Sequence, residues 1–142
     1  MQTAPITVTY DPPEHGWVRL CLTIVGREIQ IDASDVPNNP IQELAVAVRE
    51  LSEGRDASVC WHLEPEWYVM SFKHSLGGVR LEIERCGSPD DETSKQPVVA
   101  YTGADVIRPF LAFLQEFRSR DFAEGDWPEV DWRPLDRLQK PA

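Results

Sequence analysis

The sequence predicts an α+β domain built mainly on an antiparallel sheet. Three observations carry this prediction: apolar residues alternate along six short segments, turn residues separate neighbouring segments, and two longer segments carry apolar residues at helical spacing. Short connections favour antiparallel pairing, because parallel neighbours need longer crossovers. We therefore expect one sheet of six to seven strands with two amphipathic helices packed on one face, in the order βββ-α-βββ(β)-α.

The first three predicted strands occupy the N-terminal quarter of the chain. Ile6–Tyr10 alternates, and a proline-containing turn at 11–16 separates it from Trp17–Val25, where every second residue is apolar. Gly26 and Arg27 then form a tight connection into Glu28–Asp32. We expect these segments to form successive hairpins with one face toward the core.

The first helix has clear signals at both of its ends. Asn39 is placed to cap it, Pro40 suits its first position, and Gln42 completes a pattern similar to a capping box. Gly54 is a natural stop. One apolar stripe at helical spacing predicts the core-facing side; it comprises Ile41, Leu44, Ala45, Val48 and Leu51.

Strands resume after this helix and lead to a second one. Segments 57–63, 67–74 and 79–84 alternate as a meander, and 97–101 is a short closing strand. Thr102 is expected to cap the second helix. Pro109 lies inside its apolar pattern, so the helix is expected either to kink there or to begin near Arg108. Residues 1–120 are expected to form a single α+β domain, and residues 121–142 an acidic, aromatic C-terminal tail.

Composition restricts the number of domains and the expected cellular compartment. The 142 residues are 42% hydrophobic, which suits one domain with its own core. No apolar run of about 18 residues is present, so we expect no membrane-spanning helix. Residues 1–10 do not resemble a signal peptide, and the three cysteines are an odd number, so we expect a cytoplasmic location with reduced thiols.

Charge is the strongest indication of the kind of partner. The net charge is −10, from 24 acidic and 14 basic residues, and most of the excess lies in the N-terminal half. Nucleic-acid binding requires clustered Lys and Arg, which the chain lacks. We instead expect a protein partner with a basic surface. The candidate binding acids on exposed strand and helix faces are Glu28, Asp32, Asp35, Glu43, Glu50 and Glu53.

Tryptophans suggest a second contact surface. Trp67 has the opposite phase to its apolar strand neighbours, so both faces of that hairpin are expected to carry aromatic surface. Such a face needs a cover: the tail, a partner or a second copy of the chain. Trp127 and Trp132 in the tail are candidates, either as this cover or as a hook for a partner. We expect a homodimer or a tail-covered monomer.

No pattern indicates catalysis, a metal or a cofactor. Cys60 and His62 share a strand face, but His74 is expected too far along its own strand to join them as a zinc ligand. The pairing expected for this hairpin places His62 opposite Tyr68. Glu64 and Glu66 flank a turn proline and are expected to be solvated. We therefore predict no catalytic residue, no metal ligand and no cofactor.

The general plan of hairpins, two amphipathic helices and strong negative charge is similar to that of small acidic bacterial proteins, many of them toxin-immunity proteins. That resemblance implies a non-enzymatic protein-binding domain, most concretely an immunity-type inhibitor of a basic bacterial toxin. It assigns no role to any residue. Two alternatives stay open: a small-ligand-binding or enzymatic domain with a cleft between sheet and helices, and a homodimeric structural subunit.

Overall fold

The computed structural model confirms the α+β class and the order of the elements. It describes residues 6–24, 26–63, 66–75, 78–87, 94–95, 99–101 and 103–138. Within them, the elements in chain order are β1 (Thr7–Glu14), β2 (Trp17–Ile24), β3 (Arg27–Ser34), α1 (Pro40–Ser52), β4 (Ala57–His62), β5 (Trp67–Ser75), β6 (Gly78–Cys86), β7 (Ser94–Lys95), β8 (Val99–Tyr101), α2 (Gly103–Arg118) and α3 (Arg133–Asp136).

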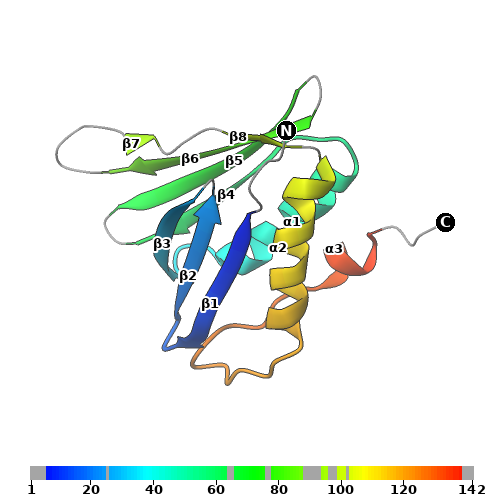
Figure 1. Cartoon of the computed structure of the whole chain (residues 1–142). Helices are drawn as coiled ribbons and strands as arrows, with labels where there is room; N and C mark the ends of the chain where they lie inside the picture. Colours follow the sequence, from blue (N-terminus) through cyan, green and yellow to red (C-terminus); the bar gives the residue numbers. More distant parts are fainter. Residues whose placement is uncertain are drawn as a thin grey trace.

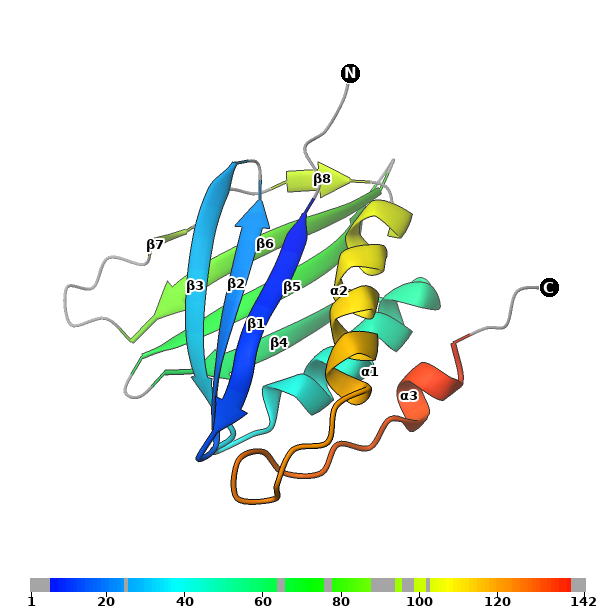
Figure 2. The same ribbon diagram turned by 60° about the horizontal axis from the view of Figure 1, so that its bottom comes forward.

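The strands form two antiparallel sheets, so the expectation of one continuous sheet is wrong. β1, β2 and β3 form the first sheet, and β4, β5 and β6 form the second, in which the short β7 and β8 both pair with β6. Figures 1 and 2 show the first sheet lying across the second, with the strands of one crossing those of the other. The alternation of residues predicts each strand but does not say which strands pair across α1.

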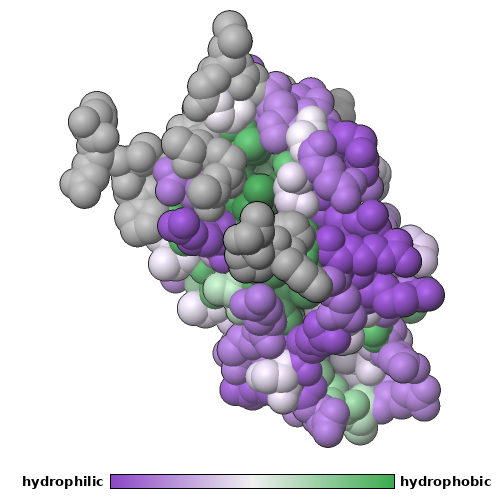
Figure 3. Space-filling model, turned by 90° about the vertical axis from the view of Figure 1, so that its right-hand side faces the viewer, coloured by the Kyte–Doolittle hydropathy of each residue, from purple (hydrophilic) through white to green (hydrophobic). Residues whose placement is uncertain are grey.

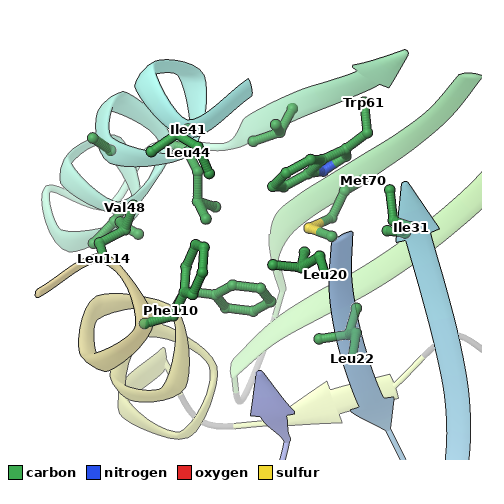
Figure 4. Packing of buried hydrophobic residues seen from close by; sticks show 14 of the residues in the cluster. Leu20, Leu22, Ile31, Ile41, Leu44, Val48, Trp61, Met70, Phe110 and Leu114 are labelled. Atoms are coloured by element: carbon green, nitrogen blue, oxygen red, sulfur yellow. The ribbon is translucent and has the colours of Figure 1, made fainter. Parts of the chain in front are cut away.

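The helices close one open side of this arrangement instead of covering one face of a single sheet. α1 contacts β4 and α2, while α2 contacts both β1 and β6. In Figure 4, Phe110 of α2 points toward Leu20 and Met70, which come from the two different sheets, and Leu114 lies beside Val48 of α1. One continuous core therefore joins all the layers.

The predicted alternation of β2 is confirmed by the burial of its side chains. The side chains at its even positions, from Val18 to Ile24, are all buried at 1% exposure or less. Trp61 of β4 and Phe110 of α2 are equally buried. Burying each such large apolar side chain stabilises the fold by roughly 1.5–3 kcal/mol.

β1 is longer than predicted and lies at an edge of its sheet. It continues beyond Tyr10 to Glu14, and its pairing with β2 is irregular between Asp11 and Glu14, where Pro12 and Pro13 stand. Prolines are tolerated there because an edge strand needs hydrogen bonds on only one side. His15 and Gly16 then turn the chain with φ values of 51° and 82°, the positive pair that a tight hairpin turn requires.

α1 begins as predicted, but one part of its cap differs. The Asn39 side chain accepts hydrogen bonds from the backbone N–H groups of Ile41 and Gln42 at 3.1 and 3.3 Å. The Gln42 side chain does not complete a capping box. Its amide instead donates to the Asp131 carbonyl at 2.8 Å and accepts from the Asp131 N–H at 2.6 Å, so it holds the C-terminal segment.

α2 runs from Gly103 to Arg118 with Pro109 inside it, so of the two expected alternatives the start near Arg108 is wrong. The expected cap, Thr102, lies outside the described residues. Among the described helices, none combines the length and apolar character needed to cross a membrane.

The C-terminal segment 121–138 packs on the domain, against the helices. Trp127 is only 3% exposed, and its ring meets Phe117 of α2 with centroids 6.3 Å apart. Trp132 contacts the same phenylalanine, and Arg118 pairs with Asp136 at 2.7 Å. The short helix α3, for which the sequence carries no signal, lies at the end of this segment.

Replacing Trp127 with alanine tests how much the packing of the C-terminal segment stabilises the fold. We expect a loss of about 3–5 kcal/mol in the free energy of unfolding, because a large buried ring is removed and a cavity is left. A chain ending at residue 120 would expose Phe117 and should self-associate or lose solubility. Urea unfolding and analytical ultracentrifugation measure the two effects. A small loss in stability together with an unchanged monomer would contradict a structural role for the segment.

Candidate functional site

An open groove lies between β1 and α2. Its volume is about 520 Å³. Figures 1 and 2 both show α2 running beside β1. The walls are mainly apolar: Ile6 and Val8 come from the β1 side, and Pro109, Ala112 and Phe113 come from α2. Such a lining suits apolar side chains or a small apolar ligand.

One wall of the groove is the edge of a sheet. Within the described residues, β1 pairs with β2 alone. In an antiparallel pair, only every second residue directs its backbone N–H and C=O groups toward the neighbouring strand. The remaining N–H and C=O groups of residues 7–11 therefore point away from β2, on the side where α2 and the groove lie. An edge of this kind is a ready template for another strand.

Three linked side chains line the polar part of the groove. The Tyr10 hydroxyl donates to Glu116 Oε1 at 2.5 Å, Arg120 Nε lies 3.3 Å from Glu116 Oε2, and the Arg120 guanidinium stands 5.8 Å from the Tyr10 ring centroid. Burial and the Glu116 hydrogen bond raise the pKa of Tyr10 to about 12, while the same hydrogen bond lowers the pKa of Glu116. At neutral pH the phenol is thus protonated and the carboxylate ionised, so neither exchanges a proton readily.

Four exposed acids follow groove-lining residues along the chain. They are not among the candidates predicted from the sequence. Asp11 and Glu14 lie on β1 just beyond Tyr10, and Asp121 and Glu124 follow Arg120. The β1–β2 turn, which follows the first pair, meets the C-terminal segment just after the second pair, where the Gly16 N–H donates to the Asp126 carbonyl at 2.9 Å. Among the described residues, none of the four forms an ion pair at salt-bridge distance, but Asp11 lies opposite Arg19 in the β1–β2 pairing and interacts with it electrostatically.

The predicted binding acids do not form one surface. Glu28 and Asp32 lie on the exposed face of β3, where Asp32 pairs with Arg19 at 2.8 Å. Asp35 follows β3 and lies against Gly16 in the β1–β2 turn. Glu50 and Glu53, near the end of α1, both pair with Arg55, and Glu53 also pairs with Arg49. Three of the six predicted acids, Asp32, Glu50 and Glu53, are thus paired with arginines.

Glu43 has a structural role instead of a solvated one. Its carboxylate accepts hydrogen bonds from the Cys60 backbone N–H at 3.0 Å and from the Asn38 side-chain amide at 2.6 Å. Asn38 also donates to the Cys60 carbonyl at 3.0 Å. These bonds connect the start of α1 to β4, so Glu43 fixes how the helix sits on the second sheet.

The predicted tryptophans are also engaged within the chain. Trp67 is half-buried on the outer face of the second sheet, opposite His62, with ring centroids 6.1 Å apart. His62 was expected opposite Tyr68, and the pairing is displaced by one residue. Trp127 is buried and Trp132 is half-buried on Phe117, so Trp127 cannot serve as an exposed hook. Trp17, at the β1–β2 turn, is 40% exposed.

The cysteine–histidine pair lacks the features of a nucleophilic site. Cys60 Sγ lies 3.4 Å from His62 Nε2, but burial, with the nearby Glu43 carboxylate, raises the pKa of the thiol. An activated thiol needs a lowered pKa. Glu66, expected to be solvated, pairs with Arg85, and Glu64 lies outside the described residues. In the part of the chain that the structure describes, no three potential metal ligands gather.

A second hollow of about 350 Å³ lies between the end of α2 and the C-terminal segment. It is lined by Phe117, Trp127 and Trp132 together with charged side chains, and it forms part of the packing of that segment. Figure 3 shows the helical side of the molecule, where the surface is mainly hydrophilic and apolar atoms gather in a narrow strip.

No protein-family model, curated protein or solved structure matches the chain. The geometry of the described residues is therefore the main guide to a function.

Replacing Glu43 with alanine tests its structural role. We expect a loss of about 1–3 kcal/mol in the free energy of unfolding, since a half-buried N–H and an amide lose their acceptor. Glu28→Ala is the control: this exposed acid on β3 makes no hydrogen bond to the backbone of another described element, so its loss should change stability much less. Equal effects of Glu43→Ala and Glu28→Ala in urea unfolding would show that Glu43 is only a surface charge.

Proposed function

We propose that this protein is a non-enzymatic protein-binding domain whose partner carries a basic surface. The observation that carries the proposal is the groove between β1 and α2, an apolar channel bounded by a strand edge that pairs with no further strand among the described residues and followed by exposed acids. Apolar contacts in the groove would supply affinity, and the acids would steer a basic partner toward it. An immunity-type inhibitor of a basic bacterial toxin is the most concrete form of this proposal.

The state of the titratable groups supports binding over catalysis. Tyr10, Glu116 and Arg120 are the ionisable side chains in the groove lining, and they satisfy one another. General acid–base catalysis favours a group whose pKa lies near the operating pH. The shifts at Tyr10 and Glu116 run away from neutrality, in opposite directions.

A small apolar ligand is the second candidate for the same groove. The volume of about 520 Å³ lies within the range of roughly 300–1,000 Å³ that such sites occupy. A homodimer is the third possibility, supported by the exposed Trp17 ring. Mutual repulsion between two chains of net charge −10 acts against it.

Photo-crosslinking in the native cells tests the proposal and identifies the partner. A photoreactive residue at Thr9, on β1, should capture a basic protein. The same residue at Gln30, exposed on β3 at the opposite edge of the sheet, is the matched control and should not. Failure to capture any protein from Thr9, or equal capture from both positions, would contradict the proposed surface.

Association rates measured with the identified partner then test electrostatic steering. We expect the rate to fall as salt is raised from about 20 to 500 mM, because screening shortens the range of the field to less than about 8 Å above physiological ionic strength. Neutralising Asp11, Glu14, Asp121 and Glu124 should lower the rate more than neutralising Glu50 and Glu53. An association rate that is independent of salt and of all six acids would contradict electrostatic steering, and with it the proposal that the partner has a basic surface.

A further inference from the structure

We propose that the groove binds an extended segment of the partner protein, which adds to β1 as a new strand and carries Lys or Arg at one end. This inference rests on the proposed protein-binding function and specifies the form of the partner. It combines three independent features of the molecule: a backbone edge on β1 that pairs with no further described strand, an apolar wall facing this edge, and exposed acids at one end.

The backbone of β1 determines the form of the occupant. Residues 6–10 line the groove, and a strand of that length spans about 17 Å at ~3.3 Å per residue. Half of their backbone N–H and C=O groups point away from β2. An extended segment satisfies these groups in register, and recognition of this kind takes its affinity mainly from backbone hydrogen bonds. A globular surface without a free strand of its own would leave them unpaired.

The opposite wall determines which side chains the segment carries. Successive side chains of a strand point to opposite faces, so every second residue of the added strand would face the core side of the groove. There it meets Ile6, Val8 and Phe113, while Ala112 leaves room on α2. Small and medium apolar residues such as Val and Ile fit this wall at alternate positions.

The charges favour a basic partner over a second copy of this chain. Within the groove, Glu116 is already bound by Tyr10 and Arg120, so it offers no free charge to the middle of the segment. Just beyond the groove stand the exposed acids Asp11 and Asp121. A second copy would bring another β1, with its own Asp11 and Glu14, into this negative region. A segment ending in Lys or Arg is complementary to it.

The direct test uses a synthetic peptide with the sequence Lys-Lys-Val-Thr-Val-Thr-Val and the ¹⁵N-labelled full chain. We expect amide chemical shifts to change in residues 7–11 and 110–116. A peptide beginning with Glu-Glu should bind at least tenfold more weakly. Two N-methylated forms of the peptide, with methyl groups on alternate sets of amides, separate strand addition from simple apolar docking. One set should abolish binding, and the other should be tolerated.

Two matched helix variants locate the site. Ala112→Arg places a long side chain in the groove from an exposed helix position and should weaken peptide binding at least tenfold. Val46→Arg makes a similar change on the exposed face of α1 and should leave binding unchanged. Circular dichroism and thermal unfolding establish that both variants fold; if Ala112→Arg does not, Ala112→Gln replaces it.

Three results would overturn the inference: no shift changes with peptide up to millimolar concentration, equal binding by both methylated peptides, or no effect of filling the groove. Wild-type dimers that Ala112→Arg converts to monomers would identify a second copy as the occupant and would also overturn it. If the crosslinked partner still binds the Ala112→Arg variant with normal affinity, strand addition fails while the proposed protein-binding function stands.

Discussion

Each of the two sheets has one apolar face, and no described hydrogen-bonded ladder joins them, so the fold depends on how those faces are buried against each other. The inner residues of β2, above all Leu20 and Leu22, are fully buried, and Figure 4 shows Leu20 facing Met70 of the second sheet and Phe110 of α2. Two sheets crossing in this way leave open sides that must be closed. The helices α1 and α2 close one of them, and they complete a single core.

The binding surface follows from that closure. α2 has to contact both sheets, which places it beside β1 without pairing to it, because a helix cannot satisfy the backbone groups of a strand edge. The result is a groove with one apolar helical wall and one hydrogen-bonding wall. The end of α2 is occupied in a different way: Phe117 receives Trp127 and Trp132 from the C-terminal segment. α2 thus forms one wall of the open groove beside β1 and, at its C-terminal end, the surface on which the C-terminal segment packs.

Local features could be predicted from the sequence, whereas contacts between distant segments could not. The alternation of β2, the Asn39 cap and the apolar stripe of α1 depend on neighbouring residues, and each is present in the structure. The division into two sheets depends on which strands pair across α1, which alternation does not encode. The role of Glu43 depends on β4 lying beside the start of α1, and its spacing in the helix gives no indication of it. The groove joins residues about 100 positions apart, so no short motif could have revealed it.

Amide hydrogen exchange in the free protein tests the central claim, that β1 presents an unpaired backbone edge, without requiring a ligand. For residues 7–11, one alternate set of amides should be protected by pairing with β2, and the other set should exchange as fast as exposed loop amides. The corresponding amides of the central strand β2 should all be protected. Equal protection of both sets in β1 would show that the edge is already covered, and it would contradict the account of the groove as a strand-binding site.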